Sequence, residues 1–199
     1  LVIAKIIYPE TKISNTLGKV EIDFKITNLN AIEALSNGAL DGLKLAGNIA
    51  AMLIAFISII ALIDYSIEFF TTLIGFKGIS LDEILGIAFQ PLAWSMGIPW
   101  NESLLVGTLM GKKIVFTELI AYADLKKVLD TNQISERTAI ICSYALCGFA
   151  NFGSIGIQLG GIGTIAPDRR KDLAKIVFKA MIGGALASWL TATIAGILI

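Results

Sequence analysis

Long apolar stretches separated by short charged segments run along the chain and predict an all-helical protein. Residues 45–63 hold no charged side chain over 19 positions, close to the about 20 that an α-helix needs to cross a bilayer. Residues 138–166 and 177–199 are two further apolar stretches, and the second holds a single charge, Lys179, near its start. Residues 20–26 instead alternate apolar and charged positions, which predicts a short strand or an extended loop.

These stretches divide the chain into six segments, most of them helical. Asn30 followed three residues later by Glu33 indicates the start of a helix. We expect the end of a span that begins upstream and a cytoplasmic loop over 1–30, a long transmembrane helix over 31–64, a connector and an interfacial helix over 65–102, a re-entrant hairpin over 103–130, a broken transmembrane helix over 131–166, and a basic turn with the final transmembrane helix over 167–199.

The distribution of lysine and arginine sets the expected topology, because cytoplasmic loops are enriched in both. The basic turn at 169–171 and the lysine-bearing loop at 12–30 are therefore expected in the cytoplasm. Residues 65–137 must then begin and end outside, so residues 104–123 are expected to dip into the membrane and return. The chain is predicted to be a multi-pass protein of the plasma membrane (a bacterial inner membrane), with the lipid bilayer as its surroundings.

Composition supports the membrane interpretation and narrows the chemistry. Hydrophobic residues make up 55% of the chain and charged residues 16%, against about 25% charged in soluble domains. The formal net charge is zero, so nothing indicates nucleic-acid binding. Histidine is absent, which excludes histidine-based catalysis and metal sites. Cys142 and Cys147 form no metal or redox motif and are interpreted as small apolar residues. Neither a metal nor a cofactor is expected.

Glu118 is the first candidate for function. A carboxylate at membrane depth costs about 2.5 kcal/mol or more on insertion scales, so it must face protein, water or a ligand. It either pairs with Lys112 or Lys113, or lies near the interface, or binds a ligand. A carboxylate accepts hydrogen bonds from adjacent hydroxyls such as those of a sugar. A re-entrant hairpin would place Glu118 near the midplane, which favours the ligand hypothesis.

Residues 147–163, CGFANFGSIGIQLGGIG, are the second candidate. Gly156 and Gly160 form a small-residue contact motif, and their presence is explained by helix packing. Packing does not explain the amide and hydroxyl of Asn151 and Ser154 beside further glycines. These predict a helix that unwinds inside the membrane, as the substrate sites of secondary transporters do. Phe149 or Phe152 would supply an apolar face for a flat ring.

Three other features of the sequence do not indicate a function. Residues 107–113, GTLMGKK, have the wrong spacing for a phosphate-binding loop. Asp64 and Glu68 are interpreted as a solvated face at the end of a span. No second carboxylate at comparable depth accompanies Glu118, so the chain is not expected to be an enzyme.

Two longer motifs resemble a known family. Residues 111–121, GKKIVFTELIA, are similar to the G-x-K-x-x-x-N-E-F-V-A signature of concentrative nucleoside transporters. Residues 147–156, CGFANFGSIG, resemble their C-G-F-A-N-x-x-S-I-G signature, and residues 4–11, AKIIYPET, also fit. The resemblance covers essentially the whole chain and corresponds to the C-terminal half of the family fold.

This resemblance implies one half of an elevator-type transporter that assembles as a homotrimer and couples nucleoside uptake to sodium or protons. It places Glu118 on the ribose hydroxyls together with Asn151 and Ser154, and Phe149 beside the nucleobase. Thr117, where the family has asparagine, would be the fifth site residue. Residues 31–64 would be the scaffold helix, and most of the ion site would lie in the other half. The alternative is a non-transporting membrane receptor or the remnant of a transporter.

Overall fold

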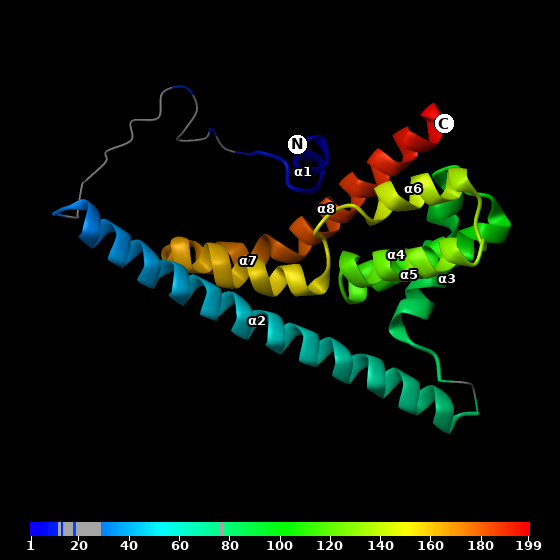
Figure 1. Cartoon of the computed structure of the whole chain (residues 1–199), viewed down its shortest axis with the longest axis horizontal. Helices are drawn as coiled ribbons and strands as arrows, with labels where there is room; N and C mark the ends of the chain where they lie inside the picture. Colours follow the sequence, from blue (N-terminus) through cyan, green and yellow to red (C-terminus); the bar gives the residue numbers. More distant parts are fainter. Residues whose placement is uncertain (12, 14–17, 19–28, 76–77) are drawn as a thin grey trace.

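The computed structural model describes residues 1–11, 13, 18, 29–75 and 78–199. All regular secondary structure in these residues is helical, as predicted (Figure 1). The expected strand or extended loop at 20–26 lies outside the described residues. The elements are α1 (Val2–Ile7), α2 (Ala31–Leu73), α3 (Leu81–Ser95), α4 (Trp100–Val115), α5 (Glu118–Asp130), α6 (Glu136–Leu146), α7 (Phe152–Ile165), the short 3-10 turn η1 (Pro167–Arg169) and α8 (Arg170–Leu198).

Helix α2 begins where the sequence predicts and ends later. The Asn30 side chain accepts a hydrogen bond from the backbone N–H of Glu33 at 2.9 Å, which caps the first turn. The helix continues past residue 64 to Leu73, because no glycine or proline interrupts it before Gly75, whose φ is +86°. Asp64 is therefore not a solvated helix end: its carboxylate accepts from the Leu81 N–H at 2.7 Å and caps the start of α3.

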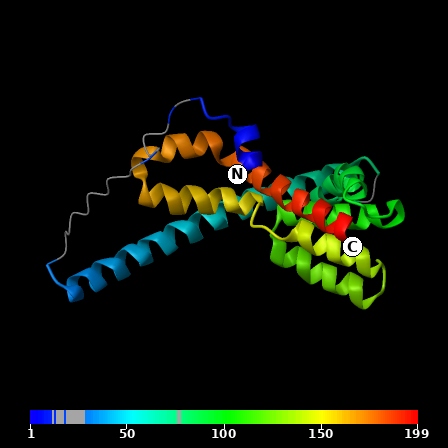
Figure 2. The ribbon, with the colours of Figure 1, turned by 90° about the horizontal axis from the view of Figure 1, so that it is seen from above.

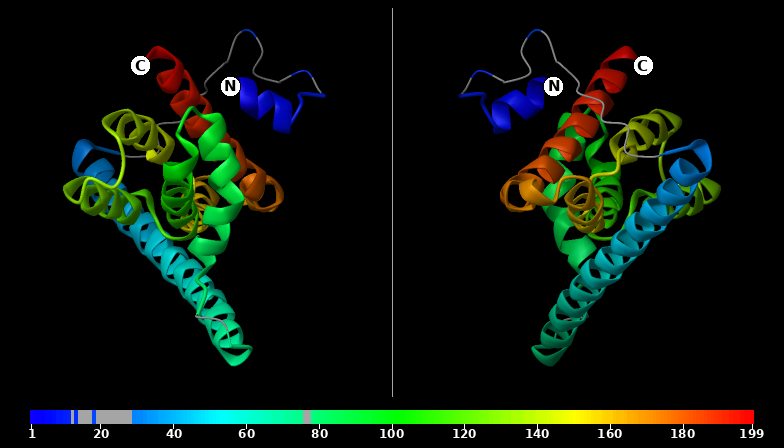
Figure 3. Two further views of the ribbon diagram at one scale, coloured as in Figure 1. Left: turned by 90° about the vertical axis from the view of Figure 1, so that its right-hand side faces the viewer. Right: turned by 90° about the vertical axis from the view of Figure 1, so that its left-hand side faces the viewer.

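Small residues on α7 let it pack closely against α2. A Cβ on Gly156 would lie 2.8 Å from the ring of Phe56 and 3.0 Å from the carbonyl oxygen of Met52, both on α2. A Cβ on Gly160 would lie 3.1 Å from the carbonyl oxygen of Asn48. The packing interpretation of these two glycines is confirmed. Helix α2 runs along one side of the other helices and projects past them at one end (Figure 3).

Helices α3 and α4 make the most extensive helix–helix contact in the molecule. They approach closely because glycine lines the contact: a Cβ on Gly111 would lie 2.6 Å from the carbonyl oxygen of Asp82. Helix α3 runs through Pro91 to Ser95, although proline inside a helix usually kinks or ends it. Pro99 does separate two helices, as the N-cap residue of α4. That α3 lies at the membrane surface stays a prediction.

Helices α4 and α5 form a helical hairpin whose turn is Phe116 and Thr117. Lys112 on α4 holds the two arms together, because its ammonium lies 2.6 Å from the carboxylate of Asp124 on α5. The same ammonium lies 3.7 Å from Asp82 on α3. The depth of this hairpin in a bilayer stays a prediction.

The core lies among α3, α4, α6 and α8, where the side chains of Met110, Ile141, Leu146 and Ala185 are buried. Helix α1 packs on α8, as seen in the view from above (Figure 2). Among the described residues, two helical stretches, Ala31–Leu73 and Pro167–Leu198, are long and apolar enough to cross a membrane. Most of the apolar surface of α2 is exposed, in keeping with lipid or protein neighbours.

Candidate functional site

A break between α6 and α7 interrupts the long apolar stretch, as the sequence predicts. Helix α6 ends at Leu146 and α7 begins at Phe152. Cys147 is extended, and Gly148 has a φ of +134°, a conformation that side chains on Cβ rarely allow. A Cβ on Gly148 would also collide with the hydroxyl of Ser188 on α8. Glycine at position 148 therefore serves both the backbone turn and the close approach of α8.

Asn151 and Ser154 build the start of α7 together. The Asn151 side-chain oxygen accepts from the Ser154 N–H at 2.8 Å, and the Ser154 hydroxyl donates to the Asn151 carbonyl at 2.6 Å. The Asn151 N–H in turn donates to the Ser154 hydroxyl at 3.3 Å. Both side chains are almost fully buried. This reciprocal cap explains why a polar pair is stable inside an apolar stretch.

The Glu118 carboxylate faces this cap across the hairpin turn. Asn151 Nδ2 donates a hydrogen bond to Glu118 Oε2 at 3.1 Å. Glu118 is the first residue of α5, where the positive end of the helix dipole favours a carboxylate. Within the described part of the chain, its other oxygen, Oε1, accepts no hydrogen bond from the protein and is available to a ligand. Figure 1 shows the start of α7 beside the turn that joins α4 and α5.

The two lysines considered as partners of Glu118 are used elsewhere. Lys112 pairs with Asp124 and Asp82. Lys113 donates to the carbonyl oxygen of Ala145 at 3.1 Å. In the described ranges Glu118 has an amide rather than an ammonium as its direct partner, so the simple ion-pair interpretation does not hold.

The remaining predicted site residues take different positions. Thr117 is the N-cap residue of α5, and its hydroxyl accepts from the Ile120 N–H at 3.4 Å. Phe149 lies in the break with its side chain 54% exposed, which leaves the ring available to a partner. Ser154 has its hydroxyl engaged in the cap of α7, where it hydrogen-bonds to the backbone of Asn151; its part in a substrate site stays a prediction. The structure therefore brings Glu118, Asn151 and Ser154 into one hydrogen-bonded group.

Two polar contacts that support this group were not expected from the sequence. Lys113 and Tyr122 both donate to backbone carbonyls at the end of α6, the latter to Ser143 at 2.6 Å. Lys113 stands inside the first family motif, which was the available signal. No group of three or more histidine, cysteine, aspartate or glutamate side chains suited to a metal ion occurs in the residues described.

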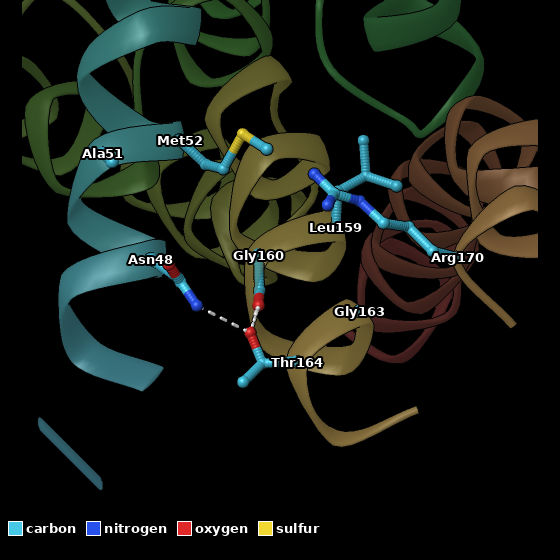
Figure 4. A pocket seen from close by; sticks show the side chains of 8 residues that line it. All are labelled: Asn48, Ala51, Met52, Leu159, Gly160, Gly163, Thr164 and Arg170. Carbon is cyan, nitrogen blue, oxygen red and sulfur yellow. Dashed lines mark hydrogen bonds between the residues drawn. The ribbon is translucent and has the colours of Figure 1, made fainter. Parts of the chain in front are cut away.

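A separate cavity of about 200 Å³ lies between α2, α7 and the start of α8 (Figure 4). Asn48 Nδ2 donates to the Thr164 hydroxyl at its rim, at 3.0 Å, and Arg170 reaches it from α8. The cavity is at the far end of α7 from Asn151 and so is distinct from the polar group. Asn48 on α2 and Arg170 of the basic turn both line this cavity. The orientation of the chain across the membrane stays a prediction.

Known proteins similar to this chain are transporters. Residues 1–196 match the family described as Na+ dependent nucleoside transporter C-terminus. The chain is 43% identical over 203 residues to the uncharacterized transporter YutK of Bacillus subtilis, covering 100% of the chain and 49% of that protein. It is 38% identical over 202 residues to the nucleoside permease NupC of Helicobacter pylori, with 100% and 48% covered. It is 36% identical over 212 residues to solute carrier family 28 member 3 of Mus musculus, with 100% and 30% covered.

Solved structures of one such protein share the fold. The chain resembles CNTnw in an inward-facing substrate-bound state, with 40% identity, a TM-score of 0.68 and coverage of 97% of the chain and 45% of that protein. A variant of CNTnw in an intermediate state gives a TM-score of 0.82 at 40% identity, with 98% and 47% covered. These neighbours have an elevator-type fold, as expected from the two motifs.

The named relatives are permeases and carriers rather than enzymes, in agreement with the sequence analysis. The chain spans half or less of the length of each of these three relatives. The matched family, the identities and the shared fold lead to one conclusion: the chain belongs to the Na+-dependent nucleoside transporter family, of which it represents the C-terminal region.

Proposed function

We propose that the full protein carries nucleosides across the membrane and that Glu118 and Asn151 bind the substrate. The Asn151–Glu118 hydrogen bond is the observation that carries the proposal, because it joins the two motifs that define the family resemblance at a distance of 3.1 Å. The free oxygen of Glu118 is a hydrogen-bond acceptor for a ribose hydroxyl. The exposed ring of Phe149 is a stacking surface for a nucleobase.

We also propose how transport is driven, in which membrane the protein lies and how it assembles. Uptake is coupled to a cation, for which the family description favours sodium over protons. The protein resides in the plasma membrane and forms a homotrimer through α2, whose exposed apolar surface suits both lipid and neighbouring subunits. This chain contributes part of the substrate site and the scaffold helix.

Uptake of radiolabelled uridine by cells expressing the full-length protein tests the substrate assignment. Glu118→Gln removes the charge and replaces an acceptor oxygen by a donor, so we expect a loss of uptake of at least tenfold. Glu136→Gln is the matched control, because Glu136 is likewise the first residue of a helix after a hydroxyl N-cap and is exposed outside the site. Glu118→Gln with the uptake of the parent would exclude Glu118 from the site.

The receptor alternative predicts a different result. A receptor or a transporter remnant would bind uridine without moving it. Proteoliposomes that hold the full-length protein therefore separate the two, since a transporter accumulates uridine inside when a sodium or proton gradient is imposed. Binding in detergent with no accumulation under either gradient would favour the receptor.

A further inference from the structure

Lys113 is a fully buried lysine that the proposed site does not use. Its side chain is 0% exposed, on the last turn of α4. In the described part of the chain no carboxylate forms an ion pair with it, and its one hydrogen bond goes to the carbonyl oxygen of Ala145 at 3.1 Å. A buried ammonium is costly unless it is compensated. A buried Lys113 ammonium therefore needs a source of negative charge close to it.

The broken end of α6 supplies that negative charge. The last four carbonyl groups of a helix lack intrahelical partners, and together they form the negative end of its dipole. Ala145 is in the last turn of α6, directly before the break. The ammonium of Lys113 also lies close to the break itself, 3.8 Å from the position of a Cβ on Gly148. Its charge is thus placed on the free carbonyl of Ala145 at the end of α6.

Both arms of the hairpin hold this helix end. Lys113 reaches it from α4, and the Tyr122 hydroxyl donates to Ser143 from α5. At the turn between the arms, Glu118 accepts from Asn151 on the other side of the break. The three bonds fix the hairpin to the broken helix, and Lys113 alone among the three donors brings a positive charge.

Broken helices in secondary transporters use freed carbonyls and helix C-termini to coordinate cations. We propose that Lys113 is a positioning residue of the nucleoside site whose ammonium acts as a built-in cation on the carbonyl end of α6. It neutralises the end of α6 and keeps the break against the hairpin, so that Asn151 stays within reach of Glu118. This inference rests on the proposed function.

Chemical rescue of uridine binding tests the role of the charge. Full-length Lys113→Ala is purified in detergent with n-propylammonium present, so that the variant folds with the missing group supplied. Removal of the amine by dialysis is expected to weaken uridine binding, measured by titration calorimetry, at least tenfold. Its return should restore binding to within threefold of the parent. Propan-1-ol, of similar size and uncharged, should not.

Two further variants separate charge from packing. Lys113→Met fills the space without charge and is expected to bind uridine at least tenfold more weakly than the parent. Lys127→Met removes an exposed lysine from the same hairpin, outside the proposed site, and should stay within threefold. Rescue by propan-1-ol equal to that by the amine, or parent-like binding by Lys113→Met, would overturn the inference and leave the proposed function intact. A parent protein that binds no uridine would instead overturn the proposed function.

Discussion

Exchange of Asn151 for aspartate tests the central contact with a change of one atom and one charge. Aspartate caps a helix as well as asparagine does, so the bond from the Ser154 N–H and the start of α7 should be preserved. The Nδ2 donor, however, becomes a second carboxylate oxygen facing Glu118 Oε2. The substitution therefore converts an attraction into a repulsion without a change of volume.

The separation of 3.1 Å sets the size of this repulsion. With an effective dielectric constant of about 20, two unit charges at this distance repel by about 5 kcal/mol. If a third of that energy is lost from the binding of uridine, the binding constant falls by more than about tenfold. The two carboxylates will either move apart or share a proton, as paired carboxylates do. Either response disturbs the acceptor proposed for the ribose hydroxyl.

Titration calorimetry of uridine on the full-length protein measures the effect. We expect Asn151→Asp to bind at least tenfold more weakly than the parent near neutral pH. Asn48→Asp is the matched control, since that asparagine lies at the far end of α7 and donates to the hydroxyl of Thr164, which can turn from the Gly160 carbonyl to donate to the new carboxylate. It should stay within threefold of the parent. Parent-like binding by Asn151→Asp near neutral pH would refute the reasoning.

Two pairs of variants test the packing around the site by the thermal unfolding midpoint of the purified full-length protein. Gly156→Ala forces a Cβ to 3.0 Å from the α2 backbone and should lower the free energy of unfolding by about 1–3 kcal/mol. The Cβ of Gly161→Ala meets nothing closer than 3.6 Å, so helix propensity should raise the free energy of unfolding by up to about 1 kcal/mol. Equal unfolding midpoints for the two variants would contradict the close packing of α7 on α2. Lys112→Gln breaks contacts to two carboxylates and should lower the free energy of unfolding by about 1.5–3 kcal/mol. Lys127, the other partner of Asp124, has a side chain that is 78% exposed, so Lys127→Gln should lower it by only about 0–1 kcal/mol. A larger loss for Lys127→Gln than for Lys112→Gln would exclude Lys112 as the link between the hairpin arms.

Local features of the structure were predictable from the sequence because they depend on neighbouring residues. The cap at Asn30 needs only a side chain and a backbone N–H three residues away. The break between α6 and α7 follows from Gly148, which adopts a positive φ, and from Asn151, which caps the next helix. The end of α2 was misplaced because charges at 64 and 68 were taken for an exit to water. In the structure Asp64 finds its partner on α3.

The candidate site residues could thus be identified from the sequence, whereas their contacts with one another could not. An amide and a carboxylate in apolar stretches indicate a polar site in a membrane protein, because each is unfavourable there without a partner. The glycines beside the amide indicate a break in the helix. Which partner each one takes depends on how the hairpin lies against the broken helix. Glu118 meets Asn151 across 33 positions and Lys113 meets Ala145 across 32, and no local pattern specifies such a separation. Composition and motifs determined the helices, the break between α6 and α7 and the candidate side chains. Only tertiary packing decided that the Asn151 amide donates to the Glu118 carboxylate and that Lys113 donates to the carbonyl end of α6.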